Sequence, residues 1–292
     1  MPAIACIAHA GSADWVRLPA ALAELRPRFG RVPVYPVGTP GEAEALAGEL
    51  ADSLELIVAY GGDGTIHQIA NGVARAGDGI AATPDGPVVI VLPGGTGNDL
   101  VRGLGLPVDP VEAAAMVADG TPVPLDLLDC GDRVAANGIN AGFAASATDV
   151  LSPRVKSALG PAAYTAGGIV AAVRMPSWPV RAEVGADVFE GEAITLVVGN
   201  GPSYGGGRRL LPAADMRDGL LDVTVVPTGS NKVRLLAGMA RKRLPGGLPS
   251  FRGEAARITT RMPCRLDGEP APTPAAVRVL PGAWRVLLPG QP

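Results

Sequence analysis

The stretch LELIVAYGGDGT, Leu54–Thr65, joins a run of apolar residues to a loop of glycines. The apolar run has the length of a buried strand, and apolar residues at helical spacing follow the loop over Thr65–Ala76. A strand that ends in glycines before a helix is typical of the carboxyl edge of a parallel sheet, where ligands bind. Glycines let a polyphosphate approach the backbone, and the start of the helix adds unpaired amides with partial positive charge.

Asp63 stands inside that loop, where pure phosphate binding would not favour it, because like charges repel. The position suits a residue that holds a magnesium-bound water or a substrate hydroxyl. The alternative is an ordinary turn between strand and helix, in which Asp63 caps the helix.

A second stretch repeats the arrangement: VVIVLPGGTGND, Val88–Asp99. Two glycine-rich loops at the ends of adjacent strands form a cradle, in which Thr96 and Asn98 can reach a phosphate or a ribose. The two loops in this order indicate a nucleotide site far more specifically than either loop alone.

The lysines limit how the first half of the chain can bind phosphate. None precedes Lys156, so a P-loop and the strand lysine of protein kinases are both absent. A nucleotide bound by the first half must therefore be held by backbone amides, small polar side chains or arginine.

Strands and helices alternate over residues 1–120, which predicts a parallel sheet with flanking helices. After the Pro-rich segment Thr121–Pro124 most segments are short and strand-like, and helical spacing returns near Arg154–Arg174 and Asn231–Arg243. We predict an α/β nucleotide-binding domain over residues 1–121 and a β-rich antiparallel domain over residues 122–292, whose extreme C-terminus can pack back on the first domain. The cleft between the domains is the expected ligand site.

The composition excludes several classes of protein. The chain has 292 residues, 47% of them hydrophobic, and a net charge of −3, which gives no global attraction to nucleic acid. Two histidines are too few for a multi-histidine metal site, and the cysteines are too sparse for a disulfide framework or a zinc site: Cys6, Cys130 and Cys264. No signal peptide is visible, and the apolar segment Ala162–Val173 is too short to span a bilayer. We expect a cytoplasmic protein whose membrane contact is peripheral, on the inner face.

Four further segments follow GGDGT and GTGND in the second half: NGINAGF (Asn137–Phe143), GNGPSYGGG (Gly199–Gly207), DGLLD (Asp218–Asp222) and DGE (Asp267–Glu269). In this order the motifs resemble those of the diacylglycerol kinase and sphingosine kinase superfamily, in its bacterial lipid kinase form. The resemblance covers nearly the whole chain. It implies a kinase that uses ATP and magnesium to phosphorylate a hydroxyl of a diacylglycerol-like or sphingoid-like lipid at the membrane surface.

The resemblance also implies roles for single residues. A magnesium ion would be bound by the side chain of Asp218 and the carbonyls of Asp215 and Leu220, which are the hard oxygen ligands that this ion prefers. Asp218-Gly219 is also a favoured turn pair, and both descriptions can hold together. Glu269 is the proposed proton acceptor, with Asp63 as the competing catalytic carboxylate. The residues predicted to bind ATP are Thr39, Gly61, Gly62, Asp63, Gly64, Thr65, Ile66, His67, Gln68, Gly95, Thr96 and Asn98.

Two segments depart from the family pattern. His9–Ser12 stands where an Asn-Pro and a Ser-Gly-Lys-like segment are usual, so the expected lysine is missing. His67-Gln68 stands where Asn-Glu is usual, so a carboxylate near the nucleotide is lost. Both histidines can face the cleft if their strands are neighbours, and the alternative is that each is a satisfied polar residue in a loop.

Two other functions stay open at this point. One is another kinase of the same superfold, such as an NAD kinase or a phosphofructokinase, although the GTGND loop and the late DGE favour a lipid. The other is a catalytically weak regulator that binds lipid or nucleotide. The motifs predict no nucleic acid partner and leave the oligomeric state open.

Overall fold

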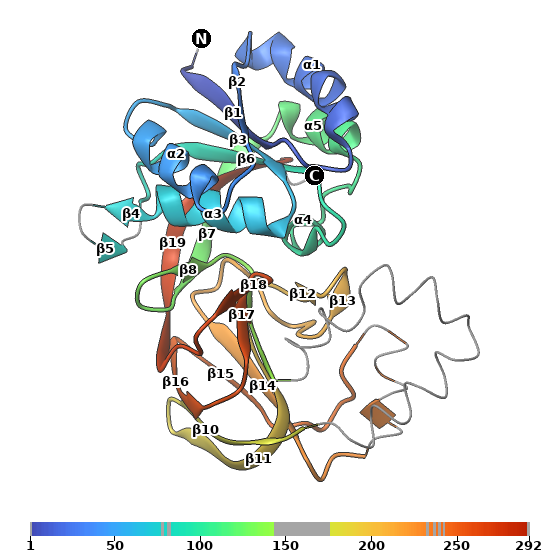
Figure 1. The fold of residues 1–292 in the computed structure, drawn as a ribbon, viewed down its shortest axis with the longest axis vertical. Coiled ribbons are helices and arrows are strands. Elements are labelled where there is room, and N and C mark those ends of the chain that lie inside the picture. The colour runs from blue at the N-terminus through green and yellow to red at the C-terminus, as the bar shows by residue number, and fades with distance from the viewer. Residues whose placement is uncertain are drawn as a thin grey trace.

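The computed structural model describes residues 2–76, 79–80, 83–142, 176–231, 234–235, 238, 241 and 243–290. They form two lobes, which lie one above the other in Figure 1. The helix expected over Arg154–Arg174 lies outside the described residues, as does most of the helix expected over Asn231–Arg243.

The first lobe contains a parallel sheet. Its strands lie in the order β2 (Val34–Val37), β1 (Ile4–His9), β3 (Leu56–Gly61) and β6 (Val88–Pro93). The helices are α1 (Leu18–Phe29), preceded by a 3-10 turn over Trp15–Arg17, α2 (Glu42–Leu50), α3 (Asp63–Val73), α4 (Asp99–Gly103) and α5 (Pro110–Ala118). They flank the sheet, where α1 packs on α5 and α2 packs on α3 (Figure 1).

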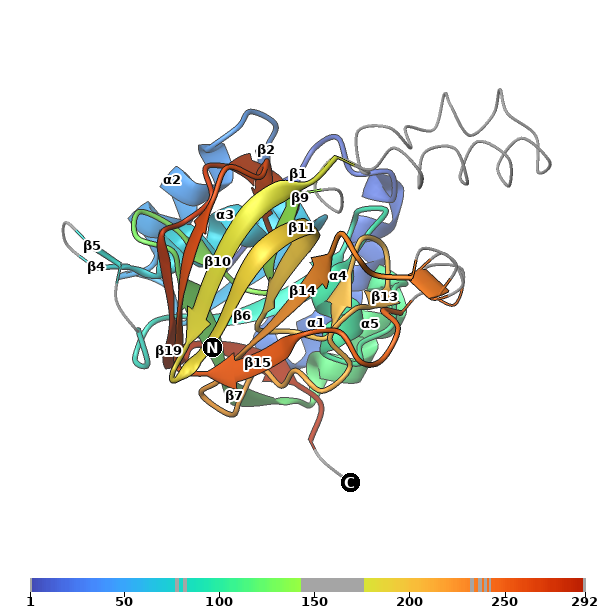
Figure 2. The same cartoon turned by 90° about the horizontal axis from the view of Figure 1, so that it is seen from below.

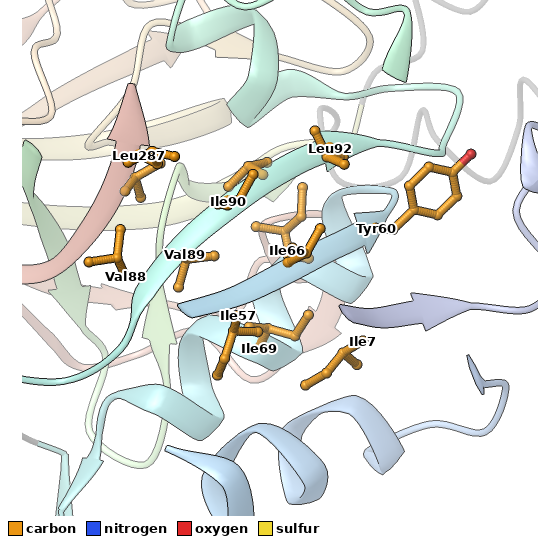
Figure 3. Packing of buried hydrophobic residues seen from close by; sticks show 14 of the residues in the cluster. Ile7, Ile57, Tyr60, Ile66, Ile69, Val88, Val89, Ile90, Leu92 and Leu287 are labelled. Carbon is orange, nitrogen blue, oxygen red and sulfur yellow. The ribbon is translucent and has the colours of Figure 1, made fainter. Parts of the chain in front are cut away.

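Continuous apolar runs explain why the central strands are buried. Every residue of β3 and β6 is buried, as expected for strands covered by helices on both faces. Ile66 and Ile69 of α3 pack with them in the core of this lobe (Figure 3). In the parallel register Gly61 lies opposite Pro93, so the two glycine-rich loops leave the sheet at the same edge.

The second lobe is built of antiparallel strands. Figure 2 looks onto its sheet from below, where β10, β11, β14 and β15 are neighbours. The strands are β7 (Thr121–Asp129), β8 (Val134–Ala135), β9 (Gly138–Gly142), β10 (Trp178–Val184), β11 (Asp187–Gly199), β14 (Leu221–Pro227), β15 (Ser250–Gly253), β16 (Ala255–Thr260), β17 (Cys264–Leu266), β18 (Glu269–Ala271) and β19 (Ala276–Leu288). Two short hairpins lie outside the sheet: β4 (Arg75–Ala76) with β5 (Gly79–Ile80), and β12 (Ser203–Tyr204) with β13 (Arg208–Arg209). The predicted fold class, an α/β lobe followed by a β-rich antiparallel lobe, is confirmed.

The last strand, β19, belongs to both lobes. Its first part pairs with β16, its last part pairs in parallel with β6, and β7 runs antiparallel beside it. Val277 contributes to the core of the second lobe, whereas Trp284, beyond a bulge in the strand, is buried in the core of the first. The two sheets are therefore continuous. The domain boundary at residue 121, which coincides with the first residue of β7, stays a prediction.

Candidate active site

The two glycine-rich loops touch each other backbone to backbone. A Cβ atom added to Gly95 would lie 2.5 Å from the Cα atom of Gly62, a separation that real side chains do not tolerate. Gly62 is the N-cap of α3, so the N-terminus of this helix lies at the same edge. The cradle predicted from the two motifs therefore has its two sides in direct contact.

Asn98 closes the second loop from inside. Its backbone is left-handed, with φ 50°, and its side chain is 4% exposed. The side-chain Oδ1 accepts a hydrogen bond from the amide of Gly95 at 3.2 Å, and Nδ2 donates to the carbonyl of Gly95 at 2.7 Å. The side chain of Asn98 is therefore used to shape the loop, and Thr96, at the exposed tip, is the polar side chain left to meet a ligand.

The contact between the loops leads to a first prediction. Gly95→Ala should force the loops apart and weaken ATP binding by roughly tenfold or more, because small misplacements of binding groups cost up to ~10²-fold. Gly38→Ala is the matched control, since a Cβ atom there meets nothing within 4 Å. Calorimetric titration with ATP measures both variants. Equal affinities would contradict the proposed cradle.

Asp63 is the first residue of α3, yet it does not cap its own helix. Its Oδ1 atom accepts a hydrogen bond from the amide of Leu100 in α4 at 3.2 Å, so the carboxylate spans the two loops. Burial, aided by the nearby carboxylate of Asp99, raises the pKa of Asp63 to about 6. A carboxylate with this pKa is ionised near neutral pH and gains from a cation or a shared proton.

Asp99 connects the second loop to the other lobe. Its carboxylate accepts hydrogen bonds from the amide of Gly206, at 3.0 Å, and from the amide of Gly207, at 2.6 Å. These two glycines belong to the GGG turn that the family resemblance singles out. The charged residue following Asn98 thus holds a turn of the second lobe against the edge where the nucleotide is expected.

The acidic triplet reaches the same edge from the second lobe. Asp267 and Gly268 form the two-residue turn between β17 and β18, with φ 47° and 95°. Glu269 follows as the first residue of β18, and its carboxylate lies against Gly64 in the first turn of α3, where any Cβ atom would collide with it. The structure thus brings Glu269 to the helix turn that contains Asp63.

His67 lies beneath this turn and is 1% exposed. Its Nδ1 atom is 3.0 Å from Oδ2 of Asp267, so it is a satisfied buried residue and does not line an open cleft. His9 ends β1, which is the neighbour of β3 as expected, and its ring lies against Gly11. The prediction that His67 contacts ATP is untested, but its ring is occupied within the protein.

Thr39 and Gln68 lie together at the other side of the edge. The amide and hydroxyl of Thr39 donate to Oε2 of Glu42, at 3.0 and 3.1 Å, and the amide of Gly41 donates to Oε1 of Gln68 at 3.1 Å. These contacts precede α2, which begins at Glu42 after Gly41 in a left-handed conformation with φ 83°.

The Asp218 loop lies in the second lobe and is anchored by a residue that the sequence analysis missed. Asp126, 2% exposed, accepts hydrogen bonds from the amides of Gly219 and Gly282, both at 2.8 Å. Its carboxylate therefore ties the loop to β19. The available signal was a charged residue inside the apolar part of β7, PLDLLD, where an unpartnered charge would be costly.

The oxygen atoms of this loop fit the chemistry of magnesium, but the carboxylate already has a cationic partner. Oδ1 of Asp218 accepts a hydrogen bond from the amide of Leu220 at 2.9 Å, and Oδ2 pairs with Arg252. Nε of Arg252 also lies 3.5 Å from Oδ2 of Asp222. An ion bound by Asp218 and the carbonyls of Asp215 and Leu220 would therefore compete with the guanidinium of Arg252.

This competition can be measured by thermal melting with magnesium or with EDTA. We expect magnesium to raise the melting temperature of Arg252→Gln more than that of the wild type, and not to raise that of Asp218→Ala. Magnesium at 100 times its Kd would add about 2.7 kcal/mol to the free energy of unfolding. Identical responses in the three proteins would contradict a metal site on this loop.

Comparisons with known proteins agree with this geometry. Residues 8–130 match the family "Diacylglycerol kinase catalytic domain", and residues 137–288 match the "YegS C-terminal NAD kinase beta sandwich-like domain". A "Probable lipid kinase YegS-like" of Xanthomonas axonopodis is 34% identical over 98% of this chain and 96% of its own length. Its counterpart in Pseudomonas aeruginosa PAO1 is 33% identical over 97% and 93%.

Solved structures show the same fold. A crystal structure of a diacylglycerol kinase from Bacillus anthracis superposes with a TM-score of 0.78 at 24% identity, covering 98% of this chain and 97% of the other. None of the helices in the described parts of the chain has the length and apolar content that crossing a bilayer requires. Two consecutive family matches and full-length relatives lead to one assignment: the chain belongs to the YegS-like lipid kinases, which carry a diacylglycerol kinase catalytic domain.

Proposed function

We propose that this protein transfers the γ-phosphate of ATP to a hydroxyl of a diacylglycerol-like or sphingoid-like lipid. One observation carries the proposal: the carboxylate of Glu269, from the second lobe, lies against the first turn of α3, next to Asp63. A nucleotide on the glycine-rich loops would thus be faced by a carboxylate from the opposite lobe.

ATP would lie along the edge formed by the two loops. The first-turn amides of α3 and the glycine backbones would supply donors for phosphate oxygens, because no lysine precedes Lys156. Thr96 is exposed at the tip of the second loop, and Thr39 and Gln68 lie at the far side of the same edge. These positions are in keeping with the predicted nucleotide contacts.

Magnesium would accompany the nucleotide, where it neutralises charge on the phosphates. Asp63 is the residue best suited to hold it or its water, because burial and the nearby carboxylate of Asp99 raise the pKa of its carboxyl, and a cation would offset both effects. A second ion, bound by Asp215, Asp218 and Leu220, would have a structural role, because these residues belong to the second lobe and not to the two glycine-rich loops.

The reaction itself requires mainly positioning and charge neutralisation. The lipid hydroxyl would enter from the side of the second lobe, and Glu269 would accept its proton. The hydroxyl oxygen then bonds to the γ-phosphorus while the bond to the bridging oxygen of ADP breaks. In-line transfer needs the base on the side opposite the leaving ADP, which favours Glu269 over Asp63 as the base.

The acceptor is tested with an ATPase-coupled assay containing diacylglycerol, sphingosine or NAD. NAD is included because the C-terminal family is described as NAD kinase-like. We expect ADP release to depend on a lipid in mixed micelles, which would stand in for the membrane surface where such an acceptor resides. Turnover with NAD alone would overturn the lipid assignment. ADP release that no acceptor stimulates would favour the alternative function, a catalytically weak regulator that binds lipid or nucleotide.

A further inference from the structure

One face of α3 contacts the second lobe near the acidic triplet. Gly64, His67 and Asn71 are spaced three and four residues apart, so they lie on the same face of the helix. Gly64 contacts Glu269, and His67 bonds to Asp267. Asn71 exchanges two hydrogen bonds with the backbone of Val134, at 2.9 and 3.0 Å.

The carboxylate of Asp267 is held mainly by its own lobe. Its two oxygen atoms accept hydrogen bonds from three consecutive amides, those of Ala136, Asn137 and Gly138, at 2.7 to 2.9 Å. These bonds fix the shape of the β17–β18 turn within the second lobe. They do not fix where the turn lies relative to the nucleotide loops.

His67 supplies the hydrogen bond that crosses to the first lobe. Nδ1 must carry a proton, because the carboxylate of Asp267 can only accept. Nε2 faces the side-chain amide of Asn71 at 3.4 Å, and that amide donates to the carbonyl of His67 at 2.8 Å, which keeps the ring in place. The imidazole is thereby fixed in orientation with its donor aimed at the turn.

We propose that His67 is a positioning residue, which sets the carboxylate of Glu269 against the start of α3 by binding Asp267. The inference rests on the proposed function, because it assigns Glu269 the role of base. Asp267 is two residues from Glu269 in a tight turn, so a shift of one carboxylate moves the other. His67 acts only through this turn and does not contact the substrate.

His67→Leu should lower kcat by about 10- to 100-fold, since a misplacement of ~1 Å can cost 10²-fold, and should leave the KM for ATP nearly unchanged. His67→Asn should restore most of the rate, because the amide Nδ2 of asparagine can take the place of the imidazole Nδ1–H. Thr83→Val is the control for general support of the fold: it removes the hydrogen bond that the hydroxyl of Thr83 donates to the carbonyl of Ala283 at 3.1 Å and touches neither His67 nor the turn. It should lower the melting temperature while keeping kcat close to that of the wild type.

The double variant His67→Leu with Glu269→Gln separates positioning from general support of the fold. If His67 acts through Glu269, the double variant should have the same kcat as Glu269→Gln alone. Losses that multiply, an equal loss of kcat in Thr83→Val, or a failure of His67→Asn to restore the rate would each overturn the inference. A wild type that phosphorylates no acceptor, or a Glu269→Gln variant of full activity, would instead refute the proposed function or its base, and the inference with them.

Discussion

Asp63→Asn should remove nearly all phosphoryl transfer and at the same time make the folded protein more stable above pH 6. The asparagine keeps the size of the side chain, and its Oδ1 atom can still accept the hydrogen bond from Leu100. It loses the negative charge that organises the cation or its water. Losing one such preorganised electrostatic group typically costs ~10²–10³-fold in kcat. Steady-state turnover with saturating lipid and ATP measures this effect.

The stability effect follows from the raised pKa of Asp63. Its pKa rises from 3.8 in the unfolded chain to about 6 in the folded protein. Between these values the folded state keeps a proton that the unfolded state has lost, so ionisation progressively destabilises the fold as the pH rises from about 4 to 6. At about 1.4 kcal/mol per pKa unit, the cost above pH 6 is at most about 3 kcal/mol.

Asparagine does not titrate, so the variant escapes this cost. Its melting temperature should match that of the wild type below pH 4 and exceed it at pH 8. A correctly folded Asp63→Asn with comparable turnover would show that Asp63 is neither catalytic nor metal-organising.

Glu269→Gln is the second substitution that we expect to lower kcat strongly. A general base contributes ~10²–10⁴-fold in rate, and we expect kcat to fall by that range. ATP affinity should stay nearly the same, because Glu269 belongs to the lobe opposite the glycine-rich loops. Turnover and ATP titration on the same preparation measure both quantities. If the variant loses ATP affinity but keeps its maximal rate, Glu269 is a nucleotide or metal ligand, and the base must be sought at Asp63.

The local parts of this architecture could be predicted from the sequence. Leu56–Tyr60 and Val88–Leu92 are apolar throughout, which identifies strands buried on both faces, and the glycines that follow mark the ligand edge. Short-range signals of this kind depend on neighbouring residues alone. They therefore predicted the parallel sheet and the two loops.

Contacts between distant segments could not be predicted in this way. His67 and Asp267 are 200 residues apart, and nothing in either segment alone indicates that they meet. The same holds for Arg252 beside Asp218. For β19 the sequence analysis predicted that the extreme C-terminus can pack back on the first domain, but not that it pairs with β6. Asn98 shows a different limit: its residue type suggested a ligand contact, whereas its buried side chain closes the loop.

Transfer of the γ-phosphate to a lipid can be followed with radiolabelled ATP. Wild-type protein, Asp63→Asn and Glu269→Gln are each incubated with lipid micelles and with ATP labelled either at the γ- or at the α-phosphate, and the organic extract is counted. We expect label in the extract only from γ-labelled ATP, abundant with the wild type and nearly absent with both variants. An extract without label from the wild type, or equal labelling by all three proteins, would contradict the claim that these two carboxylates serve phosphoryl transfer to a lipid.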